Sequence, residues 1–335
     1  MYTIVILHES IPPEPSRDAE DVYVQAEAVS KTLSEMGHTP HHLLFDLNLK
    51  NMRAQLVRHH PDIVFNLVES VAGSGALIHM APAILESVNL PYTGARTDTM
   101  FLTSNKLLAK SFLKAQGILT PYWVTMETIN QNMLPLDVPY IIKSVWEHAS
   151  IGLSNNSVII PHSQEQLYEE MKYRQKDVNG NTCFAELYID GREFSLSLLE
   201  SEEGIEVLPI AEMRFLDYPE EKWKILDYTS KWETDSFEYS HTKRSFYMAD
   251  QDSLLFEKMY ALARKCWTVF GMRGYGRIDF RVDTFQRPWV LEINTNPCIA
   301  PDSGFVAAAQ EAGLSFHHVI ERIIRASLNV SFADA

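Results

Sequence analysis

Hydrophobic positions in the N-terminal part of the chain follow two alternating periods. Short runs rich in β-branched and other apolar residues are separated by longer stretches in which apolar residues recur every three or four positions. Strands are predicted at 2–7, 42–45 and 62–68, and helices at 18–36, 49–59 and, after Gly73 and Gly75, at 76–87. Strands that alternate with helices are typical of a parallel sheet with crossover helices. We therefore predict a parallel α/β domain over residues 1–95.

The pattern changes after residue 95. Helices are predicted at 105–116, 165–173 and 253–270, and strands at 140–143, 184–189, 193–199, 275–282 and 289–293. Ser104 is expected to cap the first of these helices, with Leu108 and Phe112 facing inward. Asp190-Gly191 is a favourable two-residue turn, so the strands on either side of it are predicted to form a hairpin. This mixed α+β order predicts a central domain at 96–180 and a C-terminal domain at 181–330.

Polar side chains alternate with apolar ones along the last predicted hairpin. Arg277 and Asp279 fall on one face of its first strand, and Glu292 and Asn294 on one face of its second. Ile278, Phe280, Leu291 and Ile293 would then fill the core on the opposite face. Two carboxylates and an amide oxygen are ligands suited to Mg²⁺ that carries a polyphosphate. The alternation by itself is explained equally well by a hairpin at the edge of a sheet whose polar face is exposed to solvent.

Several charged residues upstream allow two interpretations. Lys143 ends an apolar strand, where its ammonium would need an anionic partner, because burying an unpaired charge is costly. Lys106 and Lys110 would ordinarily form the solvated face of a helix. Glu186, inside a β-rich run, suits either an exposed edge or a hydrogen bond to a ligand.

Composition narrows the class of protein. The 335 residues, 46% of them hydrophobic, are enough for two or three domains with large cores. The net charge of −15 argues against a nucleic-acid or anionic-membrane surface, since either would need a concentrated basic face. Cys183, Cys266 and Cys298 are far apart and show neither disulfide nor zinc spacing. The apolar run at 2–7 is too short to span a membrane, so we expect a cytoplasmic protein.

A series of strings then occurs in one order along nearly the whole chain. They are Leu90-Pro91-Tyr92-Thr93-Gly94, Thr103-Ser104-Asn105-Lys106, Ile141-Ile142-Lys143 with Ser150-Ile151-Gly152, 186–194, Asp227-Tyr228-Thr229-Ser230-Lys231, and 276–280 with 291–297. In that order they resemble the D-alanine–D-alanine ligase family of ATP-grasp carboxylate–amine ligases. The resemblance implies an ATP-grasp fold preceded by a parallel α/β domain. It also implies a homodimer and a place in peptidoglycan synthesis.

The activity implied by the resemblance is ATP-dependent joining of two small amino acids. The γ-phosphoryl group of ATP would move to the carboxylate of the first amino acid, and the amine of the second would attack the resulting acyl phosphate. Enzymes of phosphoryl transfer act mainly by positioning and by neutralising charge. The family likeness implies that the phosphates are bound by Lys106, Lys143, Lys231 and the loop of Ser150. It places Glu186 in the adenine hinge and Glu193 beside the ribose. It also implies that two Mg²⁺ ions are bound by Asp279, Glu292 and Asn294, that Arg277 stabilises the oxyanion, and that Ser303 binds the carboxylate of the second amino acid. Mn²⁺ could take the same ligands.

The chain departs from the family pattern near the subsite of the first amino acid. Glu69 stands where the family has histidine, Ala149 where it has serine, and Trp232 where it has tyrosine. The glycine-rich start of the first helix is replaced by residues 8–13, so the family's glutamate there has no secure counterpart. Cys298 replaces a glycine. These departures predict a different or looser choice of first substrate.

Two alternatives stay open at this point. One is an ATP-grasp ligase for another acid and amine, in secondary metabolism or peptide tailoring. The other is a nucleotide-binding regulator without turnover. The intact set of Arg277, Asp279, Glu292 and Asn294 argues against the regulator, because a binding module has less need of all the metal ligands.

Overall fold

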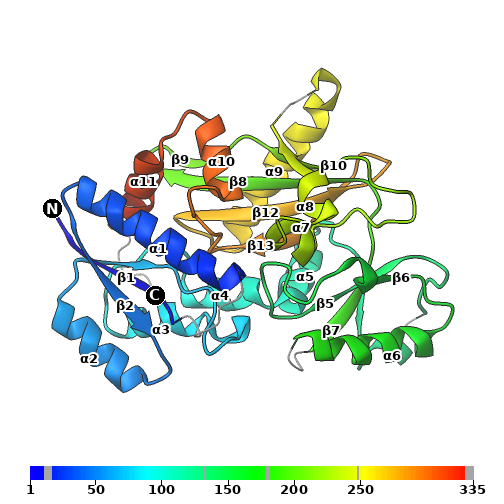
Figure 1. Ribbon diagram of the computed structural model, residues 1–335, viewed down its shortest axis with the longest axis horizontal. Coiled ribbons are helices and arrows are strands. Elements are labelled where there is room, and N and C mark those ends of the chain that lie inside the picture. The colour runs from blue at the N-terminus through cyan, green and yellow to red at the C-terminus, as the bar shows by residue number, and fades with distance from the viewer. Residues whose placement is uncertain (11–16, 132, 179–181, 247–248, 329–335) are drawn as a thin grey trace.

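The computed structural model describes residues 1–10, 17–131, 133–178, 182–246 and 249–328. Its strands form three sheets, built in turn from the N-terminal, middle and C-terminal parts of the chain. Figure 1 shows the first sheet at the lower left, the second at the lower right and the third above them. Among the described residues, no helix is both long and apolar enough to cross a bilayer.

The N-terminal sheet is parallel, as predicted. Strand β1 (Thr3–Glu9) lies at its centre, with β2 (Thr39–Phe45) on one side and β3 (Ile63–Asn66) on the other. Successive side chains of β1 point to opposite faces, and both faces are buried. This domain of the predicted fold is confirmed, with strand ends that differ from the prediction by a few residues.

Helices cover both faces of this sheet. Its first face packs against α1 (Arg17–Glu35) and also against α11 (Phe316–Leu328), from the far end of the chain. Its second face packs against α2 (Leu49–His59) and α3 (Met80–Ser87). The predicted helix at 76–87 begins late, because residues 75–77 form a separate 3₁₀ turn. The positions expected to face inward on α1 are buried: Val22, Ala26, Val29 and Leu33.

The middle sheet is antiparallel and has the order β4-β7-β5-β6. Its strands are β4 (Trp123–Thr125), β5 (Tyr140–Ser144), β6 (Val158–Ile159) and β7 (Cys183–Leu187), and α6 (Gln164–Arg174) packs against it. Short 3₁₀ helices lie at Ile129–Gln131, Asn155–Ser157 and Gln175–Val178.

Two helices before this sheet differ from the prediction. Helix α4 (Thr97–Ser104) ends at Ser104, and α5 (Lys106–Ala115) is capped by Asn105, whose side chain accepts from the Leu108 N–H. Leu108, expected inside, is 40% exposed, whereas Lys106 and Lys110 are buried. The helix is thus turned so that these two lysines face inward while Lys114 stays exposed, which side-chain hydrophobicity alone could not predict.

The prediction of a hairpin at Asp190-Gly191 is wrong. Strand β7 belongs to the middle sheet, while β8 (Arg192–Ser201) belongs to the C-terminal sheet, so the two residues lie in the crossing between sheets. Gly191 has φ +141°, and a Cβ there would lie 2.0 Å from the carbonyl oxygen of Val282. The glycine therefore serves a close approach of two backbones and not a two-residue turn.

The C-terminal sheet has the order β11-β10-β8-β12-β13, with β9 paired to β8. Its other strands are β9 (Gly204–Val207), β10 (Ala211–Phe215), β11 (Thr242–Ser245), β12 (Tyr275–Val282) and β13 (Pro288–Asn294). Helix α9 (Ser253–Val269), which follows a 3₁₀ turn at Asp250–Asp252, covers one face. The remaining helices are α7 (Tyr228–Trp232), α8 (Phe237–His241) and α10 (Gly304–Glu311). The predicted hairpin of β12 and β13 is confirmed.

Candidate active site

A cavity of about 600 Å³ lies between the middle and C-terminal sheets. Strands β5 and β7 line it from one side, and β8, β12 and β13 from the other. All of the site residues predicted from the sequence line this cavity: Lys106, Lys143, Ser150, Glu186, Glu193, Lys231, Arg277, Asp279, Glu292, Asn294 and Ser303. Residues that are far apart in the sequence are therefore brought to one place, as the predicted constellation required.

The β12–β13 hairpin presents its polar face to the cavity. Arg277 is opposite Asn294 and Asp279 is opposite Glu292 in the register, while Ile278 and Ile293 are buried in the core behind them. A bulge follows, because Phe280 pairs with Val290. The extra residue is Leu291, which was expected in the core and instead lines the cavity.

Asp279 is held by two neighbours in this structure. Its Oδ1 accepts from the hydroxyl of Ser195 at 2.7 Å, and Arg277 donates from Nε at 2.9 Å and from Nη2 to Oδ2 at 2.9 Å. Burial alone would lower the pKa of Arg277, but the charge of Asp279 raises it above its ordinary value. The guanidinium thus stays charged within the cavity.

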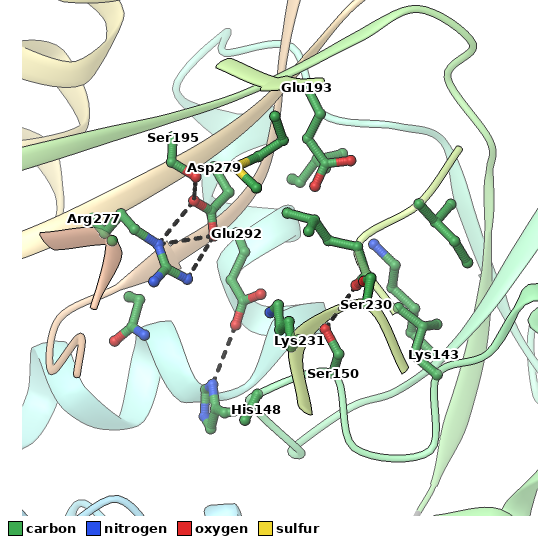
Figure 2. Close-up of a pocket in the computed structure, with 18 of the residues that line it drawn as sticks. Lys143, His148, Ser150, Glu193, Ser195, Ser230, Lys231, Arg277, Asp279 and Glu292 are labelled. Carbon is green, nitrogen blue, oxygen red and sulfur yellow. Dashed lines mark hydrogen bonds and ion pairs between the residues drawn. The ribbon is translucent and has the colours of Figure 1, made fainter. Parts of the chain in front are cut away.

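Glu292 faces a histidine and a lysine. Its Oε1 lies 3.2 Å from Nδ1 of His148 and 3.8 Å from Nζ of Lys106. In Figure 2, His148 lies below Glu292 and a dashed line marks their contact. Burial alone would raise the pKa of Glu292, yet Lys106 and then His148 bring it well below its ordinary range. Burial lowers the pKa of His148. The carboxylate is therefore ionised and the imidazole neutral near pH 7.

A buried ion-pair cluster supports the lysine of β5. Glu186 lies 2.6 Å from Nζ of Lys143 and 2.6 Å from Nζ of Lys110, and its side chain is 1% exposed. Burial would raise the pKa of Glu186, but the two lysines lower it. The Lys110 ammonium also donates to the hydroxyl of Thr120 at 2.7 Å. Lys143 thus has the anionic partner that its position demanded, and the solvated-face interpretation of Lys106 and Lys110 is wrong.

Beyond this cluster the cavity reaches the crossing between the sheets. Glu193 lies at the start of β8 and pairs with Arg281 at 3.0 Å. Burial raises the pKa of Glu193. Apolar side chains also line the cavity: Ile141, Leu187, Ile189, Ile225, Leu226 and Leu291. A slot with apolar walls and one carboxylate at its edge suits a nucleoside, with the base between the walls and the ribose beside the carboxylate.

Two covering segments, the loop at 149–150 and residues 226–232 that include α7, line the cavity and are hydrogen-bonded to each other. Ser150 donates to the carbonyl of Leu226 at 2.8 Å, and the indole N–H of Trp232 donates to the carbonyl of Ala149 at 3.1 Å. Ala149 and Ser150 both have positive φ, 55° and 63°. Lys231 of the same covering segment points into the cavity, and its pKa is lowered by burial and by Arg277.

The lining of the cavity is acidic around Asp21 and Glu69, and this part is called the acidic end. Asp21 of α1 and Glu69 line it together with Cys298, whose thiol donates to Oδ2 of Asp21 at 2.9 Å. Gln25 donates to Oε1 of Glu69 at 2.5 Å. Burial and the nearby Glu9 raise the pKa of Glu69 to about 8.

The segment at 8–13, which replaces the family's glycine-rich start of the first helix, does not supply a cavity carboxylate through Glu9. Of it, residues 11–13 lie outside the described residues. Glu9 accepts from the backbone N–H groups of Glu69 and Ser70 and does not line the cavity. Asp21, in contrast, is an acidic side chain that the first helix presents to the site.

The lining is basic around Arg244, and this part is called the basic end. Arg244 of β11 lines the cavity beside Ser303 and Gly304, which begin helix α10. The Ser303 hydroxyl accepts from the N–H of Val306, so it caps the helix. Burial and the charge of Arg277 lower the pKa of Arg244.

Asp21 and Arg244 are cavity residues that the sequence analysis missed. A weak sequence signal exists for Asp21, because Asp21 and Gln25 are polar residues one helical turn apart beside the apolar positions of α1. For Arg244 we find no sequence signal, since a basic residue on an edge strand is ordinary.

The oxygen ligands of the hairpin suit a hard divalent cation. Within the described part of the chain, no group of three or more His, Cys, Asp or Glu side chains is arranged to hold a metal ion alone. Asp279, Glu292 and Asn294 offer two carboxylates and one amide oxygen on a single face. Such a set fits Mg²⁺ that takes its other ligands from a polyphosphate and water.

Comparison with known proteins agrees with this geometry. Residues 112–325 match the model of the family described as "D-ala D-ala ligase C-terminus". The chain is 28% identical to the D-alanine–D-alanine ligase of Thermotoga maritima, over 93% of this chain and 94% of the relative. It is 30% identical to the uncharacterized protein y4sG of Sinorhizobium fredii, over 78% of this chain and 73% of that protein.

Solved structures share the fold. A D-alanine–D-alanine ligase of Bacillus anthracis complexed with ATP superposes with a TM-score of 0.70 at 19% identity, over 98% of both chains. A D-alanyl-alanine synthetase of Vibrio cholerae gives 0.73 at 15%, over 98% of this chain and 99% of that one. The family match and the ligase relatives thus define an ATP-dependent ligase, and the solved structures show its ATP-grasp fold. The chain belongs to the D-alanine–D-alanine ligase family.

Proposed function

We propose that the enzyme joins two small amino acids, with two molecules of D-alanine as the reference pair. The observation that supports this best is the polarity of the cavity. Asp21 and Glu69 form an acidic part of the lining and Arg244 and Ser303 a basic part, and Arg277 of the β12–β13 hairpin is near enough to influence the pKa of both Glu69 and Arg244. The ammonium of the first amino acid suits the acidic end, and the carboxylate of the second suits the basic end.

The nucleotide occupies the part of the cavity between the sheets in this proposal. Lys106, Lys143 and Lys231 neutralise its phosphates, and Ser150 orders the covering loop. Glu193 accepts from the ribose. Glu186 acts through Lys143, because its carboxylate is 1% exposed and already paired with two lysines.

Asp279, Glu292 and Asn294 are proposed to hold two Mg²⁺ ions, with Mn²⁺ as a substitute. The ions would supply charge neutralisation of the phosphates when bound. In this structure Arg277 pairs with Asp279, and Lys106 faces Glu292. Cations therefore already compensate both carboxylates, so metal binding competes with protein contacts.

The reaction proceeds in two displacements. A carboxylate oxygen of the first amino acid attacks the γ-phosphorus, and the bond to the bridging oxygen breaks, so that ADP leaves. The amine nitrogen of the second amino acid then attacks the acyl carbon. Arg277 stabilises the negative oxygen that forms, inorganic phosphate leaves with the C–O electrons, and the amine proton passes to solvent.

Further expectations accompany this function. The boundaries 1–95, 96–180 and 181–330 are proposed as the three domains, although α10 and α11 return to the N-terminal sheet. We expect a cytoplasmic homodimer that supplies peptidoglycan synthesis, as suits the family. We expect no nucleic-acid partner, as suits the net charge of −15.

One assay tests the proposal against its alternatives. ADP release is measured with ATP, Mg²⁺ and a panel of D- and L-amino acids, singly and in pairs, and products are identified by mass spectrometry. A dipeptide of small D-amino acids is expected. Product from a different acid and amine alone would establish the alternative ligase, a reading favoured by the carboxyl of Glu69. Tight ATP binding without ADP release from any pair would establish the regulator.

A further inference from the structure

The basic end of the cavity holds a second guanidinium besides Arg277. Arg244 lies on β11 opposite Met213 of β10, and both residues line the cavity. Among the described residues, none forms a hydrogen bond or ion pair with the Arg244 guanidinium, although Asp302 is near enough to raise its pKa. The residue is exposed overall, and partial burial of its guanidinium together with the charge of Arg277 lowers its pKa.

Arg277 cannot serve this end alone. Two of its nitrogens donate to Asp279, at 2.9 Å each, so much of its charge is neutralised within the hairpin. The proposed function also asks Arg277 to stabilise the oxyanion at the acyl carbon. A carboxylate on the incoming amine lies away from that carbon and needs donors of its own.

The start of helix α10 places such donors beside Arg244. A methyl group on Gly304 would lie 3.4 Å from Nη2 of Arg244, so the guanidinium rests against the first residue of the helix. The absence of a side chain there leaves Arg244 and the Ser303 hydroxyl on the same wall of the cavity. A guanidinium fork, a hydroxyl and the positive end of a helix together match a carboxylate.

We infer that Arg244 is a specificity-determining residue that binds the carboxylate of the amine substrate, which leaves Arg277 for the reacting centre. This inference rests on the proposed function and deepens it. It predicts that the enzyme distinguishes an amino acid from the corresponding amide at the second position, and that Arg244 provides most of that discrimination.

A competition assay measures this discrimination directly. Wild-type enzyme receives ATP, Mg²⁺ and equal amounts of D-alanine and D-alaninamide, an amine that lacks the carboxylate. The ratio of dipeptide to dipeptide amide is measured by mass spectrometry. This ratio compares kcat/KM for the two amines and is independent of the amount of folded enzyme. If the amino-acid panel reveals another amine substrate, that amine and its amide replace this pair.

The variant Arg244→Gln is compared with Arg214→Gln. Arg214 lies on the neighbouring strand β10, is paired with Glu212 at 3.4 Å and does not line the cavity. The Arg244 variant should lower the ratio by about 10- to 100-fold, as expected for loss of charged hydrogen bonds. The Arg214 variant should keep the wild-type ratio, and Arg244→Lys should fall between.

An unchanged ratio in Arg244→Gln, with dipeptide still formed, would overturn the inference and leave the proposed function intact. An equal fall in both variants would also overturn it, because the effect would then follow general loss of charge. If no pair of amino acids gives dipeptide in the wild-type assay, the proposed function itself is wrong, and the inference about Arg244 is then wrong as well.

Discussion

The indole N–H of Trp232 donates to the backbone carbonyl of Ala149 across a distance of 3.1 Å. Both positions depart from the family pattern, which has tyrosine and serine there, and the sequence alone indicated two lost hydroxyl groups. The structure shows that the departures meet. A side-chain donor uses a main-chain acceptor, so the contact between the two covering segments does not depend on the side chain at 149.

This contact predicts the behaviour of Trp232→Phe. Loss of one hydrogen bond of about 1 kcal/mol should loosen the covering segments and raise the KM for ATP roughly fivefold. The control is Trp289→Phe, which removes an indole donor to Asp283 at the hairpin turn. Steady-state ADP release at varied ATP checks both variants. A KM that changes equally in the two would show that the Ala149 contact has no special part.

The hairpin carboxylates give the second prediction. Asp279→Asn and Glu292→Gln should each lower Mg²⁺-dependent ligation by about 100-fold or more, because each removes a charged ligand at the site of phosphoryl transfer. Soluble, folded protein is expected in both cases. The matched control is Asp283→Asn, at the turn of the same hairpin and outside the cavity lining. Wild-type turnover in either variant would reject the metal assignment.

The lysines separate a binding role from a structural role. Lys106→Ala and Lys143→Ala should weaken binding of a non-hydrolysable ATP analogue, measured by calorimetry, because each removes a charge matched to phosphate. Lys110→Met should instead lower the free energy of unfolding by about 3–5 kcal/mol, since it removes one partner of the buried Glu186. Unchanged affinity in both alanine variants would make those lysines structural as well.

The pKa of Glu69 predicts a pH dependence of stability. Burial and Glu9 raise it to about 8, from about 4.5 in the unfolded chain. Between these values the folded protein keeps a proton that the unfolded chain has released, so wild-type stability falls as pH rises. Glu69→Gln lacks this loss. Chemical unfolding should therefore show the variant gaining on the wild type between pH 5 and 8, by a few kcal/mol at most. A constant difference would mean that Glu69 is ionised throughout.

Local patterns predicted the parts of this protein that local physics determines. The buried strand β1 and the amphipathic helix α1 follow from hydrophobic periodicity, and the polar face of β12–β13 follows from alternation. Asp190-Gly191 failed because the same dipeptide also suits a crossing where a glycine is needed for close packing against Val282. No local signal distinguishes the two.

Contacts between distant segments could not be predicted. The inward turn of α5 depends on Glu186, which lies on a strand of the middle sheet and neutralises Lys110 and Lys143. Without that partner, burial of Lys110 would be unfavourable, so the sequence favoured a solvated face. Asp21 and Arg244 reach the cavity from the first helix and an edge strand, and only the folded arrangement reveals it.

The acidic end of the cavity predicts how the first substrate is chosen. Asp21 and Glu69 offer carboxyl groups to an ammonium, whereas the family's histidine would not. The Cys298 thiol donates a hydrogen bond to Oδ2 of Asp21 at 2.9 Å, and burial raises the pKa of that thiol well above its ordinary value. Asp21→Asn should therefore raise the KM for the first amino acid by about tenfold and leave the KM for ATP unchanged, whereas Asp98→Asn, outside this cavity, should change neither. First substrates other than D-alanine should also be accepted by the wild type. D-alanyl-D-alanine as the only efficient product in mass spectrometry would reject this altered choice.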